Sequence, residues 1–107
     1  MNHNFGLLPE DLEIICQILA QEPTIEKAII FGSRAKGNYK TGSDVDIALQ
    51  GPYITSETVS NIRYQLNEET LMPYKFDVLN YHTIKERALI EHIDRVGIVF
   101  YEKSSKY

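Results

Sequence analysis

"FGSRAKGNYKTGSDVDIAL", residues 31–49, is the stretch that decides the fold. Its start belongs to the apolar segment "EKAIIFGS" (26–33), whose β-branched residues and closing Gly32 predict a buried strand. Its end, "SDVDIAL" (43–49), alternates strictly, which predicts a second strand. The connection "RAKGNYKTG" (34–42) is rich in Gly and Asn, which favour turns. The stretch therefore predicts two consecutive strands joined by a short loop.

The rest of the chain predicts three helices and two further strands around this pair. Apolar residues at helical spacing indicate helices over about 9–21, 55–71 and 83–94, and the third opens with Thr83 and Glu86 in capping-box spacing. Strands are expected over 74–81 and 97–102. This order predicts an α+β fold, with a small mixed, largely antiparallel sheet and helices packed mainly on one face. We expect residues 1–107 to form a single domain.

Charge and composition exclude several classes of protein. The chain has 11 basic and 15 acidic residues, and its formal charge of −4 is the wrong sign for holding nucleic acid through phosphates alone. No apolar run approaches the roughly 20 residues of a membrane span, and the start lacks the regions of a signal peptide. The single Cys16 lies in an apolar stretch, which suits a buried thiol in a reducing compartment. We therefore expect a cytoplasmic protein.

Three aspartates on two expected strands are candidates for a metal site. Side chains alternate along a strand, so Asp44 and Asp46 project from one face while Val45 points to the other. Like charges this close raise each other's pKa unless a cation lies between them, and Mg²⁺ is the usual one. Asp77 is a third acid within an otherwise apolar strand. If the two strands are neighbours, the acids converge on a patch for one or two ions, as in two-metal phosphoryl transfer.

Each of these features also has an ordinary structural explanation. An Asp-x-Asp pair often marks the solvent face of a strand, Gly32-Ser33 is typical of a turn, and an edge strand tolerates an outward Asp77. Their combination in one short chain favours a single phosphate and metal site over three unrelated structural features.

Other common sites are excluded. A Walker A loop fails because Asn38 and Tyr39 stand where Lys and Ser or Thr are required, and the dinucleotide fingerprint lacks its second glycine. His3, His82 and His92 share no metal-ligand spacing, so no zinc site is expected. His82 is interpreted as a residue at the start of a helix.

Gly32-Ser33, ten residues and then Asp44-Val45-Asp46 resemble the G-S-x10-D-x-D signature of the nucleotidyltransferase superfamily that includes DNA polymerase beta. With "GSRAKG", "SDVDIAL" and "FDVLNY" in about a hundred residues, the chain looks like the minimal nucleotidyltransferase (MNT) antitoxins of HEPN/MNT toxin-antitoxin pairs. The resemblance covers nearly the whole chain and implies a nucleotidyltransferase fold.

The resemblance implies roles for particular residues. Asp44, Asp46 and Asp77 would bind the catalytic metal, which is two Mg²⁺ ions in the family's pattern, and Asp77 would help deprotonate the attacking hydroxyl. Gly32 and Ser33 would hold the β and γ phosphates of ATP through backbone and hydroxyl donors.

Four further residues near the motif are weaker candidates. Arg34, Lys36 and Lys40 would add positive charge near the triphosphate, although basic loop residues are often simply solvated. Ser43 is taken as a supporting nucleotide ligand because it directly precedes the acidic pair.

The function that the resemblance implies is Mg²⁺-dependent transfer of AMP from ATP to a tyrosine hydroxyl of a partner HEPN RNase toxin. The chain would then act as an antitoxin in a hetero-oligomer with the toxin, without direct contact to nucleic acid or membrane. Two alternatives stay open: a non-catalytic antitoxin that masks the toxin, and a small-molecule nucleotidyltransferase, which needs an acceptor-binding domain. Template-dependent polymerisation is disfavoured because neither charge nor size provides a duplex-binding surface.

Overall fold

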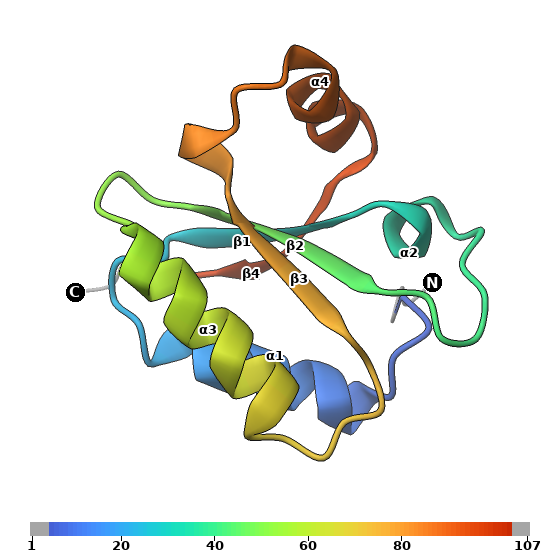
Figure 1. The fold of residues 1–107 in the computed structure, drawn as a ribbon. Helices are drawn as coiled ribbons and strands as arrows, with labels where there is room; N and C mark the ends of the chain where they lie inside the picture. Colours follow the sequence, from blue (N-terminus) through green and yellow to red (C-terminus); the bar gives the residue numbers. More distant parts are fainter. Residues whose placement is uncertain (1–4, 104–107) are drawn as a thin grey trace.

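The computed structural model describes residues 5–103 and consists of a four-stranded sheet with helices around it (Figure 1). In chain order the elements are α1 (Pro9–Ala20), β1 (Lys27–Phe31), α2 (Ser33–Lys36), β2 (Val45–Gln50), α3 (Ser56–Glu68), β3 (Phe76–Asn80), the 3₁₀ helix η1 (Tyr81–Thr83), α4 (Arg87–Val96) and β4 (Ile98–Glu102). His3 lies outside the described residues.

The sheet is mixed and largely antiparallel, as expected. Its strand order is β3-β2-β1-β4; β1 runs antiparallel to both β2 and β4, and β2 runs parallel to β3. Figure 1 shows α1 and α3 side by side on one face of the sheet and α4 on the other. The helices are therefore mainly on one face, with α4 as the exception.

The larger core lies between the sheet and the α1–α3 layer. Ile15 and Leu19 of α1 and Leu66 of α3 are completely buried there, as their helical spacing predicts. Cys16 is only half-buried, which corrects the expectation of a buried thiol. Partial burial, and secondarily the neighbouring carboxylate of Glu13, raises the pKa of this thiol.

The start of the last helix differs from the prediction. The hydroxyl of Thr83 donates to the carbonyl oxygen of Asn80 at 3.2 Å, and α4 begins only at Arg87. The capping-box prediction for Thr83 and Glu86 was therefore wrong: Thr83 belongs to the 3₁₀ turn η1, which Asn80 caps by accepting from the backbone N–H of His82.

His82 lies at the start of a helix, as expected, but this is the short 3₁₀ helix η1 and not α4, and its side chain joins two loops. Its Nε2 accepts a hydrogen bond from the backbone N–H of Gly51 at 3.0 Å, and so it holds η1 against the turn after β2.

Within residues 5–103, no helix is long and apolar enough to cross a bilayer.

Candidate functional site

Gly32 and Asp46 are in direct contact at the end of β1. The last residue of β1, Phe31, pairs with Asp46 of β2, and Gly32 follows with φ 75° and ψ −155°, a conformation essentially restricted to glycine. A Cβ atom at Gly32 would collide with Oδ2 of Asp46. The structure thus requires glycine here for two reasons, backbone conformation and the space that the carboxylate occupies.

Asp46 lies opposite Asp77 on the neighbouring strand. The parallel register of β2 and β3 makes these two residues Cα partners, so the condition that the two strands are neighbours is met. Strand alternation directs Val45 and Ile47 into the core under α1 and α3, and therefore directs Asp46 to the face that carries α4. Asp44, two residues before Asp46, precedes the first residue of β2. The three acids therefore lie close enough together for Asp77 and Asp44 to raise the pKa of Asp46.

The electrostatics of this acidic face centre on Asp46. Burial, then the negative charge of Asp77, then that of Asp44 raise the pKa of Asp46 from 3.8 to about 6. Asp44 and Asp77 are exposed, whereas Asp46 is half-buried. An ionised Asp46 therefore lies in a place with little solvation and two negative neighbours, where a cation would be stabilising.

The chemistry of these donors fits a hard divalent cation. Carboxylate oxygens are the ligands that Mg²⁺ prefers, and burial, followed by the charges of Asp77 and Asp44, raises the pKa of Asp46 in the absence of a cation. Among residues 5–103, no three His, Cys, Asp or Glu side chains are already gathered closely enough to hold an ion. The exposed side chains of Asp44 and Asp77 are the ones that can turn toward Asp46 at little cost.

Helix α4 forms one side of the acidic face. Its Ile93 is buried in a small cluster with Ile29, Phe31 and Ala48, on the face of the sheet that carries Asp46. The ring of His92 meets that of Phe31 edge-on, with centroids 6.2 Å apart. Phe31 pairs directly with Asp46, so this helix limits access to the acids from one side.

The short helix α2 follows Gly32 and carries Ser33 at its start. The turn is closed by a hydrogen bond from the N–H of Lys36 to the carbonyl oxygen of Gly32, 3.1 Å long. Ser33 is half-buried, and Lys36 and Lys40 are exposed. The sequence indicated only a turn here, because a helix of four residues has too few positions to show a periodicity.

Arg34 points inward, which the sequence did not indicate. It is 4% exposed: its Nε and Nη2 donate to the carbonyl oxygen of Ser43 at 3.1 and 2.8 Å, and its Nη1 donates to that of Phe5 at 2.8 Å. The guanidinium also lies 5.2 Å from the ring centroid of Tyr39 and 5.4 Å from that of Tyr74. Arg34, in α2, thus holds the other end of the connection to β2 through the carbonyl oxygen of Ser43. Nucleotide binding by Arg34 stays a prediction.

Ser43 ends the same connection. Its carbonyl oxygen accepts from Arg34, and its hydroxyl oxygen accepts from the backbone N–H of Lys40 at 2.8 Å. Ser43 therefore fixes the chain just before Asp44, and its role as a nucleotide ligand also stays a prediction. The contacts of Arg34 with Phe5 and Tyr74 join segments far apart in the chain, so no local sequence pattern announces them.

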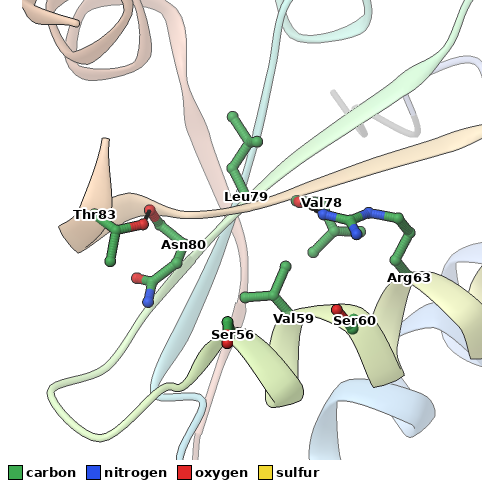
Figure 2. A pocket seen from close by; sticks show the side chains of 8 residues that line it. All are labelled: Ser56, Val59, Ser60, Arg63, Val78, Leu79, Asn80 and Thr83. Atoms are coloured by element: carbon green, nitrogen blue, oxygen red, sulfur yellow. Dashed lines mark hydrogen bonds between the residues drawn. The ribbon is translucent and has the colours of Figure 1, made fainter. Parts of the chain in front are cut away.

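A pocket of about 270 Å³ between α3 and β3 is separate from the acidic site (Figure 2). Val78 and Asn80 line it, and Arg63 reaches across from α3 to donate to the carbonyl oxygen of Val78 at 2.9 Å. The side-chain oxygen of Asn80 accepts from the N–H of His82, and none of the three acids lines the pocket. This pocket is therefore not the candidate nucleotide site.

Several solved structures share this fold. A toxin-antitoxin crystal structure with AMP-PNP is 18% identical, with a TM-score of 0.71 over 91% of this chain and 76% of that one. The structure of the tri-AMPylated Shewanella oneidensis HEPN toxin in complex with MNT antitoxin contains a chain that is 14% identical, with a TM-score of 0.67 over 88% of this chain and 71% of that one. A putative nucleotidyltransferase from Sulfolobus solfataricus is 25% identical, with a TM-score of 0.52 over 90% and 80%.

Sequence comparison gives the family. No curated protein matches the chain significantly. The family model described as "Polymerase beta, Nucleotidyltransferase" matches residues 13–106, which include the Gly-Ser turn and all three acids. This chain therefore belongs to the polymerase beta nucleotidyltransferase family.

Proposed function

We propose that this chain is an Mg²⁺-dependent adenylyltransferase that transfers AMP from ATP to a tyrosine hydroxyl of a partner HEPN-type RNase toxin, and so acts as its antitoxin in the cytoplasm. Membership of the polymerase beta nucleotidyltransferase family does not by itself specify the metal, the acceptor or the biological role.

One observation carries the proposal: Asp46 lies between Gly32 and Asp77. The carboxylate is packed against the glycine on one side and faces a second acid across a parallel strand pair on the other. A polyanion bound at Gly32-Ser33 would need a cation to neutralise its charge. The three acids beside it would need a cation for the same reason. ATP with Mg²⁺ supplies both.

The residues have separate roles in this proposal. Asp44, Asp46 and Asp77 would hold the metal, which neutralises charge on the phosphates when bound. The backbone of Gly32 and the hydroxyl of Ser33 would bind the β and γ phosphates, with Arg34 and Ser43 holding the loop that ends at Asp44. Asp77, exposed on β3, would accept the proton of the attacking hydroxyl.

The reaction balances without a further reactant. The acceptor oxygen forms a bond to the α phosphorus of ATP, the bond from that phosphorus to the bridging oxygen breaks, and pyrophosphate leaves. The proton of the acceptor hydroxyl passes to a carboxylate of the site and then to solvent.

The choice of acceptor and nucleotide is supported by similar proteins. One structural neighbour is a toxin-antitoxin complex with AMP-PNP, and in another an AMPylated HEPN toxin is bound to an MNT antitoxin. These neighbours are 18% and 14% identical to this chain, so they support its function only by analogy of fold.

The test is transfer of label to a partner protein. The chain is co-expressed with the protein encoded beside it, and the purified pair is incubated with Mg²⁺ and ATP labelled at the α or the γ phosphate. We expect label from the α phosphate alone on the partner, and its loss in Asp44→Asn and Asp46→Asn. Asp94→Asn is the matched control, because Asp94 is exposed on α4 and the amide still accepts from the Tyr81 hydroxyl.

Two results would contradict the proposal in different ways. If Asp44→Asn and Asp46→Asn neutralise the partner's RNase activity as fully as the wild type, the chain acts by masking and not by catalysis. If label is transferred to a small molecule but not to the partner, the activity is that of a small-molecule nucleotidyltransferase.

A further inference from the structure

An apolar groove lies away from the acidic face, between the start of α1 and the chain that follows α3. Its volume is about 480 Å³, and Met72 and Pro73 form part of its lining. Three of its lining side chains are large, apolar and exposed: Leu8 at 55%, Ile14 at 37% and Leu71 completely. Isolated exposed apolar residues are common, but three around one groove are typical of a surface that binds another molecule.

The two segments that supply the lining of this groove, which we call its rim, carry only negative charge. The two segments that build it, residues 8–14 and 68–73, contain five acidic residues and no Lys, Arg or His. Asp11 is buried and accepts a hydrogen bond from the Tyr74 hydroxyl at 3.0 Å. The other four are exposed: Glu10, Glu13, Glu68 and Glu69. These segments alone hold more net negative charge than the whole chain, whose net charge is −4.

This charge excludes most possible occupants. A second copy of the chain would bring two acidic rims together, and like charges directly opposed cost several kcal/mol. Nucleic acid and anionic membranes carry the same sign as the rim. The occupant that satisfies both features has apolar residues along one side and Lys or Arg on either side of them.

We propose that this groove binds a basic amphipathic helix of a partner protein. Apolar residues of that helix, at the spacing i, i+3, i+4 and i+7, enter the groove between Ile14 and Leu71, and its basic residues meet the four exposed glutamates. The groove belongs to the α1–α3 side of the fold, whereas Asp46 belongs to the face that carries α4. A partner bound here leaves the acidic site open to its acceptor.

The inference rests on the proposed function only for the existence of a protein partner, and its test does not use transfer. The probe is a synthetic peptide of about 14 residues with leucines at i, i+3, i+4 and i+7 and lysines elsewhere, titrated into the full chain without ATP. We expect NMR shifts at Leu8, Ile14, Leu71 and Met72. The same peptide with Glu in place of Lys should bind at least about tenfold more weakly.

Substitutions separate the groove from the rest of the surface. Leu71→Ser and Ile14→Ser should each weaken binding of the lysine peptide by about tenfold. Because the Leu71 side chain is completely exposed, Leu71→Ser should leave the melting temperature unchanged. Tyr53→Ser is the matched control, since Tyr53 is 76% exposed in the turn after β2 and should not affect binding.

Three outcomes would overturn the proposal: shifts that map outside the groove, equal binding of the lysine and glutamate peptides, or a wild-type dimer that Leu71→Ser converts to monomer. The Asp46→Asn variant should bind the lysine peptide like the wild type. Peptide binding without AMP transfer would leave this inference standing and remove the proposed function.

Discussion

Asp46 is the residue at which stability and the proposed chemistry oppose one another. Its pKa is raised from 3.8 to about 6 by burial, Asp77 and Asp44, so the folded chain holds this proton more tightly than the unfolded chain does. Linkage then requires that stability falls as pH rises from about 4 to about 6, where only the unfolded chain loses the proton. At neutral pH, without metal, the ionised carboxylate destabilises the fold.

The first prediction follows from this sign. A shift of this size corresponds to about 3 kcal/mol, and partial exposure of the side chain reduces the expected effect to about 1 kcal/mol. In metal-free buffer near neutral pH, Asp46→Asn should therefore raise the melting temperature by about 4 °C. Near pH 4 the gain should vanish, because Asp46 is already protonated in the folded chain. A lower melting temperature for Asp46→Asn at neutral pH would contradict this account.

Gly32 gives a second prediction at the same scale. Gly32→Ala introduces both an unfavourable backbone conformation and a collision with the Asp46 carboxylate, and should destabilise the fold by about 3 kcal/mol in urea denaturation. Gly37 is the matched control: its φ is 88°, but a Cβ atom there meets nothing within 4 Å. Gly37→Ala should cost only about 1 kcal/mol. Equal costs for the two would show that the contact with Asp46 is unimportant.

Among the elements, the connection from α2 to β2 depends on a side chain and not on regular structure. The guanidinium of Arg34 holds the carbonyl oxygens of Ser43 and Phe5, so the segment leading to Asp44 is tied to the start of the described chain. Among residues 5–103, no carboxylate lies within ion-pair distance of Arg34. The buried charge is stabilised by carbonyls and two aromatic rings, which makes it sensitive to small changes.

We therefore predict that Arg34→Ala lowers the free energy of unfolding by about 3 kcal/mol, because a buried and a partly buried carbonyl oxygen lose charged donors. Arg34→Lys should recover only part of this, since one ammonium cannot reproduce the planar arrangement of donors. Hydrogen exchange should quicken at residues 37–43 in both variants. Arg87→Ala, at an exposed position of α4, is the control and should change neither property.

The outer edge of β3 is closed by the side chain of Asn67 on α3. Its Oδ1 accepts from the N–H of Phe76 at 2.8 Å, and its Nδ2 donates to the carbonyl oxygen of Phe76 at 3.0 Å, as a neighbouring strand would. Asn67→Asp keeps the acceptor and removes the donor, and should cost about 1 to 2 kcal/mol in urea denaturation. Asn61→Asp, at an exposed position of the same helix, should have almost no effect. Similar costs for both variants would show that Asn67 does not close this edge.

For the whole molecule, the order of the three long helices and four strands, and the acidic face, follow from the sequence because they depend on local periodicity, whereas the short helices α2 and η1 do not. Alternation in "SDVDIAL" placed Asp44 and Asp46 on one face, and the parallel register with β3 brought in Asp77. The inward turn of Arg34, the late start of α4 and the contact of His82 with Gly51 did not follow. Each of these features depends on which segments distant in the chain come into contact. The local spacing of residues does not determine those contacts.

The central claim is that Gly32, Asp44, Asp46 and Asp77 form one site for a nucleotide and a divalent cation, and calorimetric titration with a non-hydrolysable ATP analogue tests it most directly. We predict binding that requires Mg²⁺ and is lost in Asp46→Asn and Gly32→Ala, while Asp94→Asn and Gly37→Ala bind like the wild type. Binding that is unchanged by Asp46→Asn, or that is equally strong without Mg²⁺, would contradict the claim.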